Sequence, residues 1–125
     1  MALPGENTLD EGTVRDRLGR ALPRWRFEGG AIKRTYRTHG WKGTLMVVNA
    51  VGHLAELAWH HPDLTVSYDS VEVRLVTHSA KGITDKDIAL ARKIEDVITW
   101  NPKADDGPLE GTPSDPRFAY LVVDT

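Results

Sequence analysis

Helical and strand patterns follow one another within residues 41–77, which read WKGTLMVVNAVGHLAELAWHHPDLTVSYDSVEVRLVT. From Trp41 to about His60, apolar residues recur at a spacing of about 3.6, which is typical of an amphipathic helix with one wide buried face. Pro62 disfavours the helical conformation at the residue before it, so we expect the helix to end at the histidine pair. The sequence therefore predicts a central helix that delivers His60 and His61 to its C-terminal end.

A β-hairpin is predicted directly after this helix. Residues 64–68 and 71–77 alternate apolar and polar side chains on either side of a polar pair at 69–70. A turn at 69–70 sets a register in which His61 lies opposite His78. Three imidazoles are then expected to meet at one end of the sheet, and a register shifted by one residue would still leave His78 close to the pair.

A helix and two strands are predicted before this segment. Thr8 and Glu11 form a capping-box pattern ahead of apolar residues at helical spacing, so we expect a helix over about 9–21. Aromatic and arginine residues alternate next, Gly29-Gly30 interrupts them, and residues 31–38 are rich in strand-forming types. This pattern indicates two strands joined by a glycine turn.

A third helix is predicted after the hairpin. Thr84 begins it with Asp87 at the acidic capping-box position, apolar residues at helical spacing give it a buried face, and it ends near Trp100. The resulting order is α-β-β-α-β-β-α. Such an order, with hairpins of adjacent strands, favours an α+β fold in which helices cover one face of an antiparallel sheet.

Composition narrows the classes of function. The 125 residues, 40% hydrophobic and 27% charged, suit one domain with one apolar core. The absence of cysteine excludes disulfides, a thiolate zinc site and a cysteine nucleophile. A net charge of −2 without a basic cluster argues against nucleic acid as a direct ligand. Residues 1–7 show no leader pattern and no segment is apolar enough to span a membrane, so we expect a cytoplasmic protein.

The C-terminal part of the chain has a different character. We expect a domain over 1–102, followed by an acidic, proline-rich extension over 103–125. Residues 101–125 hold four of the seven prolines and five acidic against two basic residues, and an apolar, strand-like run lies at 118–123. A segment of this kind can add an edge strand to a sheet or dock on a partner protein.

The histidines are the candidate site. Glu56 and His60 are four residues apart on one helix face, so the carboxylate is expected to orient the imidazole. Imidazoles with near-neutral pKa values can give a proton to a leaving hydroxyl and take one from a ring nitrogen, each role being worth roughly 10² to 10⁴ in rate. Dehydration requires that pair of acts and needs neither a metal nor a nucleophile.

Simpler roles compete with this interpretation. A single histidine at a helix end usually serves to interact favourably with the helix dipole. Three imidazoles can also hold a zinc ion, although the spacing here is not the His-Glu-x-x-His of a zinc motif. On local grounds Asp87 is foremost a helix-capping residue, and Tyr68 and Trp59 are foremost packing residues. His39 and His53 are expected at the surface without a role.

The motif as a whole resembles that of the pterin-4a-carbinolamine dehydratase family, also known as the dimerisation-cofactor family. Its separated elements agree in residue type and spacing, and the match spans about residues 9–100 with Leu22-Pro23-Arg24-Trp25 and Arg34-Thr35-Tyr36 as further similarities. The elements of the motif in this chain are Glu56, His60-His61-Pro62, Tyr68, Thr77-His78 and Gly82-Ile83-Thr84-Asp85-Lys86-Asp87.

The resemblance implies a four-stranded antiparallel sheet with three helices on one face, assembled as a homodimer or homotetramer. It also implies a lyase that dehydrates 4a-hydroxytetrahydrobiopterin to quinonoid dihydropterin, in the recycling of tetrahydrobiopterin for aromatic amino-acid hydroxylases. His60 and His78 would be the acid/base pair, and His61 would bind and orient the pterin. Glu56 would support His60, and Asp87 would lie at the edge of the substrate site. No cofactor or metal is implied, because the pterin is the substrate.

A second interpretation is a non-catalytic, dehydratase-like binding protein. Members of this fold also act as a dimerisation cofactor of a transcription factor and as chaperones in Rubisco assembly, and such chaperones tend to lose the histidine set. Retention of His60, His61 and His78 therefore favours the enzyme. The C-terminal extension favours a partner role, and Thr38 and Trp41 stand where the family commonly has aromatic residues in and just after the second strand.

Overall fold

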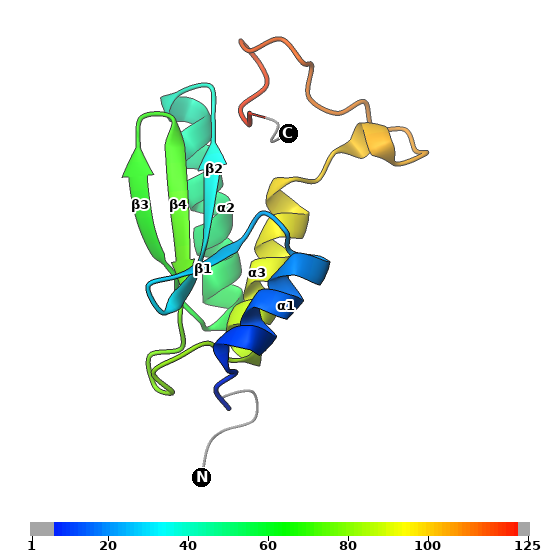
Figure 1. Ribbon diagram of the computed structural model, residues 1–125. Helices are drawn as coiled ribbons and strands as arrows, with labels where there is room; N and C mark the ends of the chain where they lie inside the picture. Colours follow the sequence, from blue (N-terminus) through cyan, green and yellow to red (C-terminus); the bar gives the residue numbers. More distant parts are fainter. Residues whose placement is uncertain (1–6, 123–125) are drawn as a thin grey trace.

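Three α-helices and four strands follow one another in the predicted order in the computed structural model, which describes residues 7–122 (Figure 1). Residues 1–6, on which the expectation of no leader segment rests, and Val123 of the predicted late strand lie outside the described residues. The elements are α1 (Glu11–Ala21), β1 (Arg26–Glu28), β2 (Ala31–Arg37), α2 (Trp41–Ala58), β3 (Asp63–Ser67), β4 (Ser70–Leu75), α3 (Asp85–Ile98) and a short 3-10 helix (Pro102–Ala104).

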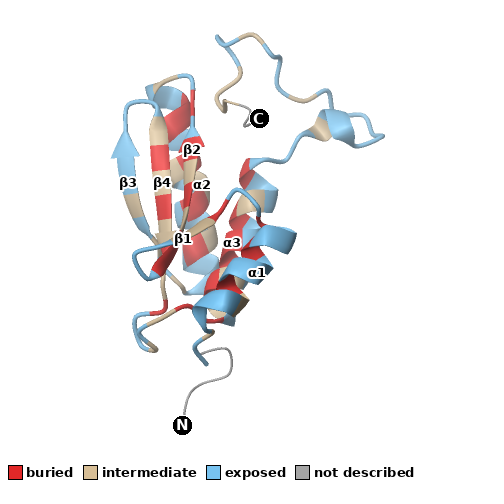
Figure 2. Cartoon of the chain, in the orientation of Figure 1, coloured by how far each residue is buried: buried red, intermediate tan, exposed pale blue. Residues whose placement is uncertain are grey.

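The four strands form one antiparallel sheet in the order β1-β2-β4-β3. Side chains of β4 alternate strictly: Val71, Val73 and Leu75 are fully buried, whereas the residues between them are partly exposed. The three helices pack on the apolar face and leave the other face polar (Figures 1 and 2). The predicted α+β fold, with helices on one face of a four-stranded antiparallel sheet, is confirmed.

The predicted register of the second hairpin is wrong by two residues. The turn lies at 68–69, Ser67 faces Ser70, and the ladder ends where Asp63 faces Arg74. Continued past its end, this register would put residue 76 and not His78 opposite His61. A shift of two keeps every side chain on its own face, so the alternation of apolar and polar residues cannot distinguish the two registers.

Contacts distant in sequence hold the turn in its place. The backbone N–H of Thr38 donates to the carbonyl of Asp69 over 2.9 Å. The hydroxyl of Thr44, in the first turn of α2, donates to the carbonyl of Tyr68 over 2.9 Å. The turn position therefore depends on β2 and α2, which the local sequence of the hairpin does not contain.

The helix starts were predicted with mixed success. The capping box of α3 is present as expected, with the Thr84 side chain on the helix N-terminus and the Asp87 carboxylate on the backbone N–H of Thr84. At α1 the predicted cap Thr8 is wrong: Asp10 is the N-cap and accepts from the backbone N–H of Thr13 over 2.8 Å. Asp10 is an equally good capping residue, and Leu9 before it is already bonded to the carbonyl of Ile83.

The C-terminal extension folds back on the same chain. The backbone N–H of His39 donates to the carbonyl of Tyr120, and that of Val122 to the carbonyl of Arg37, with N–O distances of 3.0 and 2.8 Å. Within the described residues the predicted late strand is reduced to a single bridge between Thr38 and Leu121. The extension therefore lines the end of β2 that β1 leaves uncovered.

Candidate active site

The chain reverses sharply where α2 ends. Trp59 takes a left-handed conformation with φ of 52°, which is uncommon for a bulky residue and terminates the helix. Its backbone N–H and that of His60 both turn back to the last carbonyls of the helix, including that of Ala55. Because of this turn, the consecutive side chains of His60 and His61 contact different parts of the molecule.

His60 contacts the N-terminus of α3. Its Nε2 lies 2.6 Å from Oδ1 of Asp87, whose side chain is fully buried, while 14% of the His60 side chain is exposed. An ionised carboxylate only accepts hydrogen bonds, so the imidazole donates from Nε2, and in the neutral ring the lone pair is on Nδ1. Asp87 therefore fixes both the orientation and the tautomer of an imidazole that solvent can still reach.

The other oxygen of Asp87 is saturated by two donors. Oδ2 accepts from the hydroxyl of Thr77 over 2.7 Å and from the backbone N–H of Thr84 over 2.9 Å. Because the Thr77 proton is given to Asp87, the hydroxyl of Thr84 must donate in the 2.8 Å contact between the two threonines. The result is a buried chain of hydrogen bonds that runs from Thr84 through Thr77 and Asp87 to His60.

His61 has a separate, exposed partner. Its Nε2 lies 2.7 Å from Oε1 of Glu56, and the side chains are 50% and 67% exposed. The ring of Trp59 meets the His61 ring edge-on, with 5.1 Å between the ring centroids. Glu56 and Trp59 together hold His61 at the surface, although an exposed contact of this kind contributes little to stability.

His78 lies in the loop that follows β4, at the same end of the sheet as the end of α2 (Figure 1). Residues 78–81 form a short turn closed by backbone pairing between Thr77 and Gly82. The His78 side chain is exposed, and within residues 7–122 the structure gives it no side-chain hydrogen bond. Its neighbour Thr77 contacts Asp87, so His78 is one residue removed from the hydrogen-bond chain.

These contacts revise the pairs expected from the sequence. Glu56 was expected to orient His60, four residues on, but the left-handed turn at Trp59 gives Glu56 to His61 instead. Asp87 caps α3 as expected, and it also orients His60, a contact that was not predicted. The buried link through Thr77 was not predicted. The one sequence signal for Thr77 is its place next to His78 in the family motif.

A mostly apolar groove with a volume of about 840 Å³ adjoins His60 between α2 and α3. We call His60, His61 and His78 together the histidine cluster. Neither His61 nor His78 lines the groove, so His60 is the one member of the cluster that the groove contacts. Across residues 7–122 no three side chains of His, Cys, Asp or Glu are grouped so that they could hold a metal ion. The residues that line the groove are Leu54, Leu57, Ala58, Trp59, His60, Lys86, Ala89, Leu90, Lys93 and Val97.

Comparison with known proteins assigns the family. The family model described as pterin 4 alpha carbinolamine dehydratase matches residues 7–97, which include all the elements that build the histidine cluster. The chain belongs to this family. The family match stops before the last residue of α3, so the C-terminal extension lies outside the part of the chain shared with the dehydratase family.

Relatives from distant organisms carry the same family name. A protein of Aquifex aeolicus, named provisionally as a pterin-4-alpha-carbinolamine dehydratase, is 48% identical over 77 residues, which are 62% of this chain and 78% of that protein. One of Thermomicrobium roseum with the same name is 44% identical over 91 residues, which are 73% of this chain and 97% of that protein. The dehydratase-like part is therefore similar to almost the whole of a family member.

A solved structure shares the fold. The crystal structure of a transcriptional coactivator/pterin dehydratase from Brucella melitensis superposes with a TM-score of 0.67 and 33% sequence identity, and covers 75% of this chain and 100% of that chain. The arrangement of the sheet and helices is thus one that the pterin dehydratase family is known to adopt. Among the described helices, none is long and apolar enough to cross a membrane.

Proposed function

We propose that this chain is a hydro-lyase that dehydrates 4a-hydroxytetrahydrobiopterin, or a closely related pterin-4a-carbinolamine, to the quinonoid dihydropterin. The observation that carries the proposal is the hydrogen bond between His60 and the fully buried Asp87, beside the loop of His78. Membership of the dehydratase family supports the class of substrate. The pterin is the substrate, and the proposed reaction needs no separate cofactor.

The proposed chemistry divides into two proton transfers. One imidazole gives a proton to the 4a-hydroxyl, the C–O bond breaks, and water leaves. The other takes the proton from the neighbouring ring nitrogen, whose electron pair completes the new C=N bond. His60 suits the second act, because its hydrogen bond to Asp87 leaves Nδ1 as a base and stabilises the imidazolium that forms. His78, exposed in its loop, suits the first.

His61 and Glu56 suit a binding role in this scheme. Their pair is exposed and lies away from the buried hydrogen-bond chain, so it can meet the substrate without taking part in proton transfer. Polar groups held in place by a partner can orient a pterin ring at small entropic cost. We assign His61 to binding and orientation of the pterin, with Glu56 as the residue that positions it.

The test is an assay of 4a-hydroxytetrahydropterin dehydration against the spontaneous reaction. We expect wild type to accelerate it, and His60→Ala and His78→Ala each to lose roughly 10² to 10⁴ of the rate. His53→Ala is the matched control, since His53 is an exposed histidine on the same helix outside the cluster. Near wild-type rates in both single variants would contradict the acid/base assignment, and no acceleration by folded wild type would refute the dehydratase.

A second candidate function is a binding role with or without catalysis. The Brucella melitensis neighbour is described as a transcriptional coactivator as well as a pterin dehydratase, and the extension over 103–125 is outside the family match. A partner complex that survives in a His60→Ala, His78→Ala double variant would support this role. Loss of the complex in that variant would tie any partner to the catalytic cluster instead.

We also propose that the chain forms a homodimer or homotetramer. Several large apolar side chains of α2 and the turn after it are exposed, which is costly for an isolated chain and typical of an interface. Sedimentation of wild type beside Leu45→Glu tests this, and a fall in mass is expected because a charge would enter the interface. The exposed apolar residues of this region are Trp41, Leu45, Met46, Leu57 and Trp59.

A further inference from the structure

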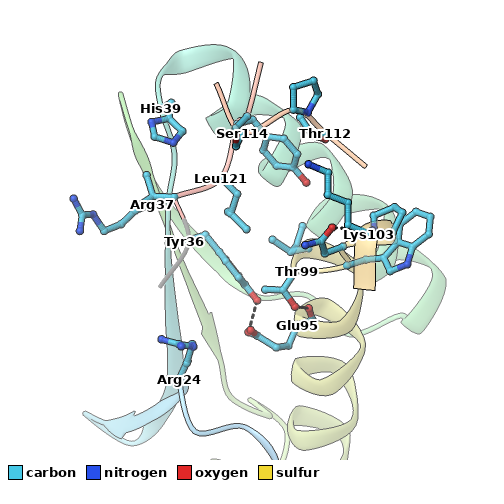
Figure 3. A pocket seen from close by; sticks show the side chains of 18 of the residues that line it. Arg24, Tyr36, Arg37, His39, Glu95, Thr99, Lys103, Thr112, Ser114 and Leu121 are labelled. Carbon is cyan, nitrogen blue, oxygen red and sulfur yellow. Dashed lines mark hydrogen bonds between the residues drawn. The ribbon is translucent and has the colours of Figure 1, made fainter. Parts of the chain in front are cut away.

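A second cavity lies at the opposite end of the sheet from the histidine cluster. Its volume is about 540 Å³, within the usual range for small-molecule sites. Its walls come from β2, the end of α3 and the C-terminal extension, as Figure 3 shows for the side chains of Tyr36, Glu95 and Thr112. The extension lies beyond residues 7–97, which the family model matches, so the family match does not cover this wall of the cavity.

Contacts with β2 and α2 hold the last described residues of the extension in place over the cavity. Two backbone hydrogen bonds join Tyr120 and Val122 to the end of β2. Tyr120 also packs on Gly43 of α2 so closely that a Cβ there would lie 2.6 Å from the Cβ of Tyr120. Residues 120–122, which form the roof of the cavity, are thus held by backbone hydrogen bonds to the sheet and by a close contact with α2.

The charges around the cavity are segregated. Of the charged residues in the described part of the extension, four are acidic and two are basic, yet none of these carboxylates lines the cavity. The extension instead gives the cavity Lys103 and the hydroxyls of Thr112 and Ser114. Two of those carboxylates are engaged elsewhere, Asp105 by the indole N–H of Trp100 and Asp115 by Arg117. One of the two cationic side chains in the described extension, that of Lys103, therefore lines the cavity, whereas none of its carboxylates does.

The core side of the cavity is cationic as well. Arg24, Arg34 and Arg37 line it, and Glu95 is the one carboxylate among its described lining residues. Glu95 is already held by Arg34, with Nε and Nη2 of the arginine 2.9 and 3.2 Å from its two oxygens. In Figure 3, Arg37 points away from the cavity and Arg24 lies below the hydrogen bond between Tyr36 and Glu95, whereas Lys103 lies on the side of the extension.

Aromatic and aliphatic side chains complete the walls. Tyr36 is almost fully buried, Tyr120 is half-buried, and the indole of Trp100 lies at the border with the extension. Leu121 points into the space beside Tyr36 (Figure 3). Flat apolar walls with a few cationic and hydroxyl groups suit a planar ring that carries a negative charge.

We propose that this cavity binds a small organic anion in which a carboxylate or phosphate is attached to a planar ring. Lys103, which lies beside the hydroxyls of Thr112 and Ser114, would hold the anionic group. Tyr36, Leu121 and Trp100 would enclose the ring. The site is distinct from the histidine cluster and would exist whether or not the chain is a dehydratase.

The test is titration of the full chain with phenyl phosphate and with benzoate, followed by calorimetry and by the NMR signal of the Trp100 indole. We expect saturable binding of at least one probe, weakened by added salt and reduced about tenfold by Lys103→Gln. Lys42→Gln is the matched control, because Lys42 is an exposed lysine that lines neither cavity. It should bind as wild type does.

Four outcomes would overturn the proposal. The first is that neither probe saturates, and the second is that Lys103→Gln binds as tightly as wild type. The third is that phenol binds as tightly as phenyl phosphate, which would show that the anionic group is not recognised. The fourth is that inorganic phosphate competes as well as phenyl phosphate, which would show that the ring is not recognised.

Discussion

Asp87 takes part in two structures at once. One oxygen orients His60, and the other completes the capping box of α3 and accepts the Thr77 hydroxyl. The carboxylate is thus held by the helix N-terminus, which favours negative charge, while it directs an imidazole toward solvent. Any change at Asp87 will mix an effect on helix stability with an effect on the proposed chemistry, so the role of the hydrogen-bond chain is better tested one residue away.

Thr77 offers that test, because its hydroxyl contacts Asp87 without capping the helix. We expect Thr77→Val to lower kcat for dehydration about tenfold and to cost about 1–2 kcal/mol in unfolding free energy, since one oxygen of Asp87 loses a buried donor. Thr77→Ser should restore both values. The pH profile of kcat separates the two effects: it should move in Thr77→Val if His60 is oriented through Asp87, and a profile identical to wild type would leave Thr77 a purely structural residue.

Glu95 is a half-buried carboxylate that contributes to the pH dependence of stability. Burial acts to raise its pKa, but hydrogen bonds from Arg34, Tyr36 and Trp25 outweigh it and hold the pKa below the ordinary value of 4.5. A lowered pKa in the folded state means that the stabilisation is complete above the ordinary value and is lost as the pH falls through the folded one. The fold should therefore weaken in acid as this carboxylate is protonated.

Glu95→Gln should destabilise the protein at neutral pH by about 3 kcal/mol, because Arg34 is left buried with an uncharged partner. The variant should also lose less stability than wild type below the ordinary glutamate pKa. Urea unfolding at neutral and acidic pH measures both effects. Asp96→Asn is the control, as its carboxylate pairs with Arg92 at the surface. An unchanged slope of stability against pH in Glu95→Gln would assign the acid sensitivity to other carboxylates.

At the scale of elements, the sequence predicted best what depends on neighbours in the chain. The capping box at Thr84 and Asp87 requires only four consecutive residues, and it was predicted correctly. The hairpin register depends on Thr38 and Thr44, which contact the turn from other elements. Glu56 contacts His61 instead of His60 because of one backbone conformation, the left-handed one at Trp59. Residue patterns thus predicted the elements that carry these residues, whereas the partner of each side chain depended on contacts between elements.

The close contact between α2 and the extension predicts unequal effects at two glycines of the same helix. An alanine Cβ at Gly43 would overlap Tyr120, whereas one at Gly52 meets nothing within 4 Å. We expect Gly52→Ala to be neutral or to stabilise by up to about 1 kcal/mol, the intrinsic helical preference for alanine. Gly43→Ala should lose this gain and release the extension.

Limited proteolysis and thermal unfolding of both glycine variants measure this difference. Faster cleavage within 103–122 in Gly43→Ala alone is the expected result. Equal resistance of the two variants to proteolysis would show that the extension does not depend on its contact with Gly43.

For the molecule as a whole, the two ends of the sheet are separate in structure and are expected to be separable in function. A chain truncated at Pro102 keeps all of α3 and every residue of the histidine cluster. We therefore expect its dehydration kcat to stay within about twofold of wild type, and phenyl phosphate binding to be lost because Lys103 and the roof are gone. Circular dichroism provides the folding control. If the truncated chain folds but does not dehydrate the substrate, the extension is needed by the active site.

The extension also changes how the sheet can meet other chains. An uncovered strand edge is a template for pairing with further strands, and a sheet with two such edges can grow without limit. Here the end of β2 is occupied by residues 120–122, and β1 at that edge is only three residues long. The five-residue β3 is left as the longer open edge. If two copies joined through that edge, it would be used up in both partners, and such a dimer would leave no long strand edge from which ordered fibrils could grow.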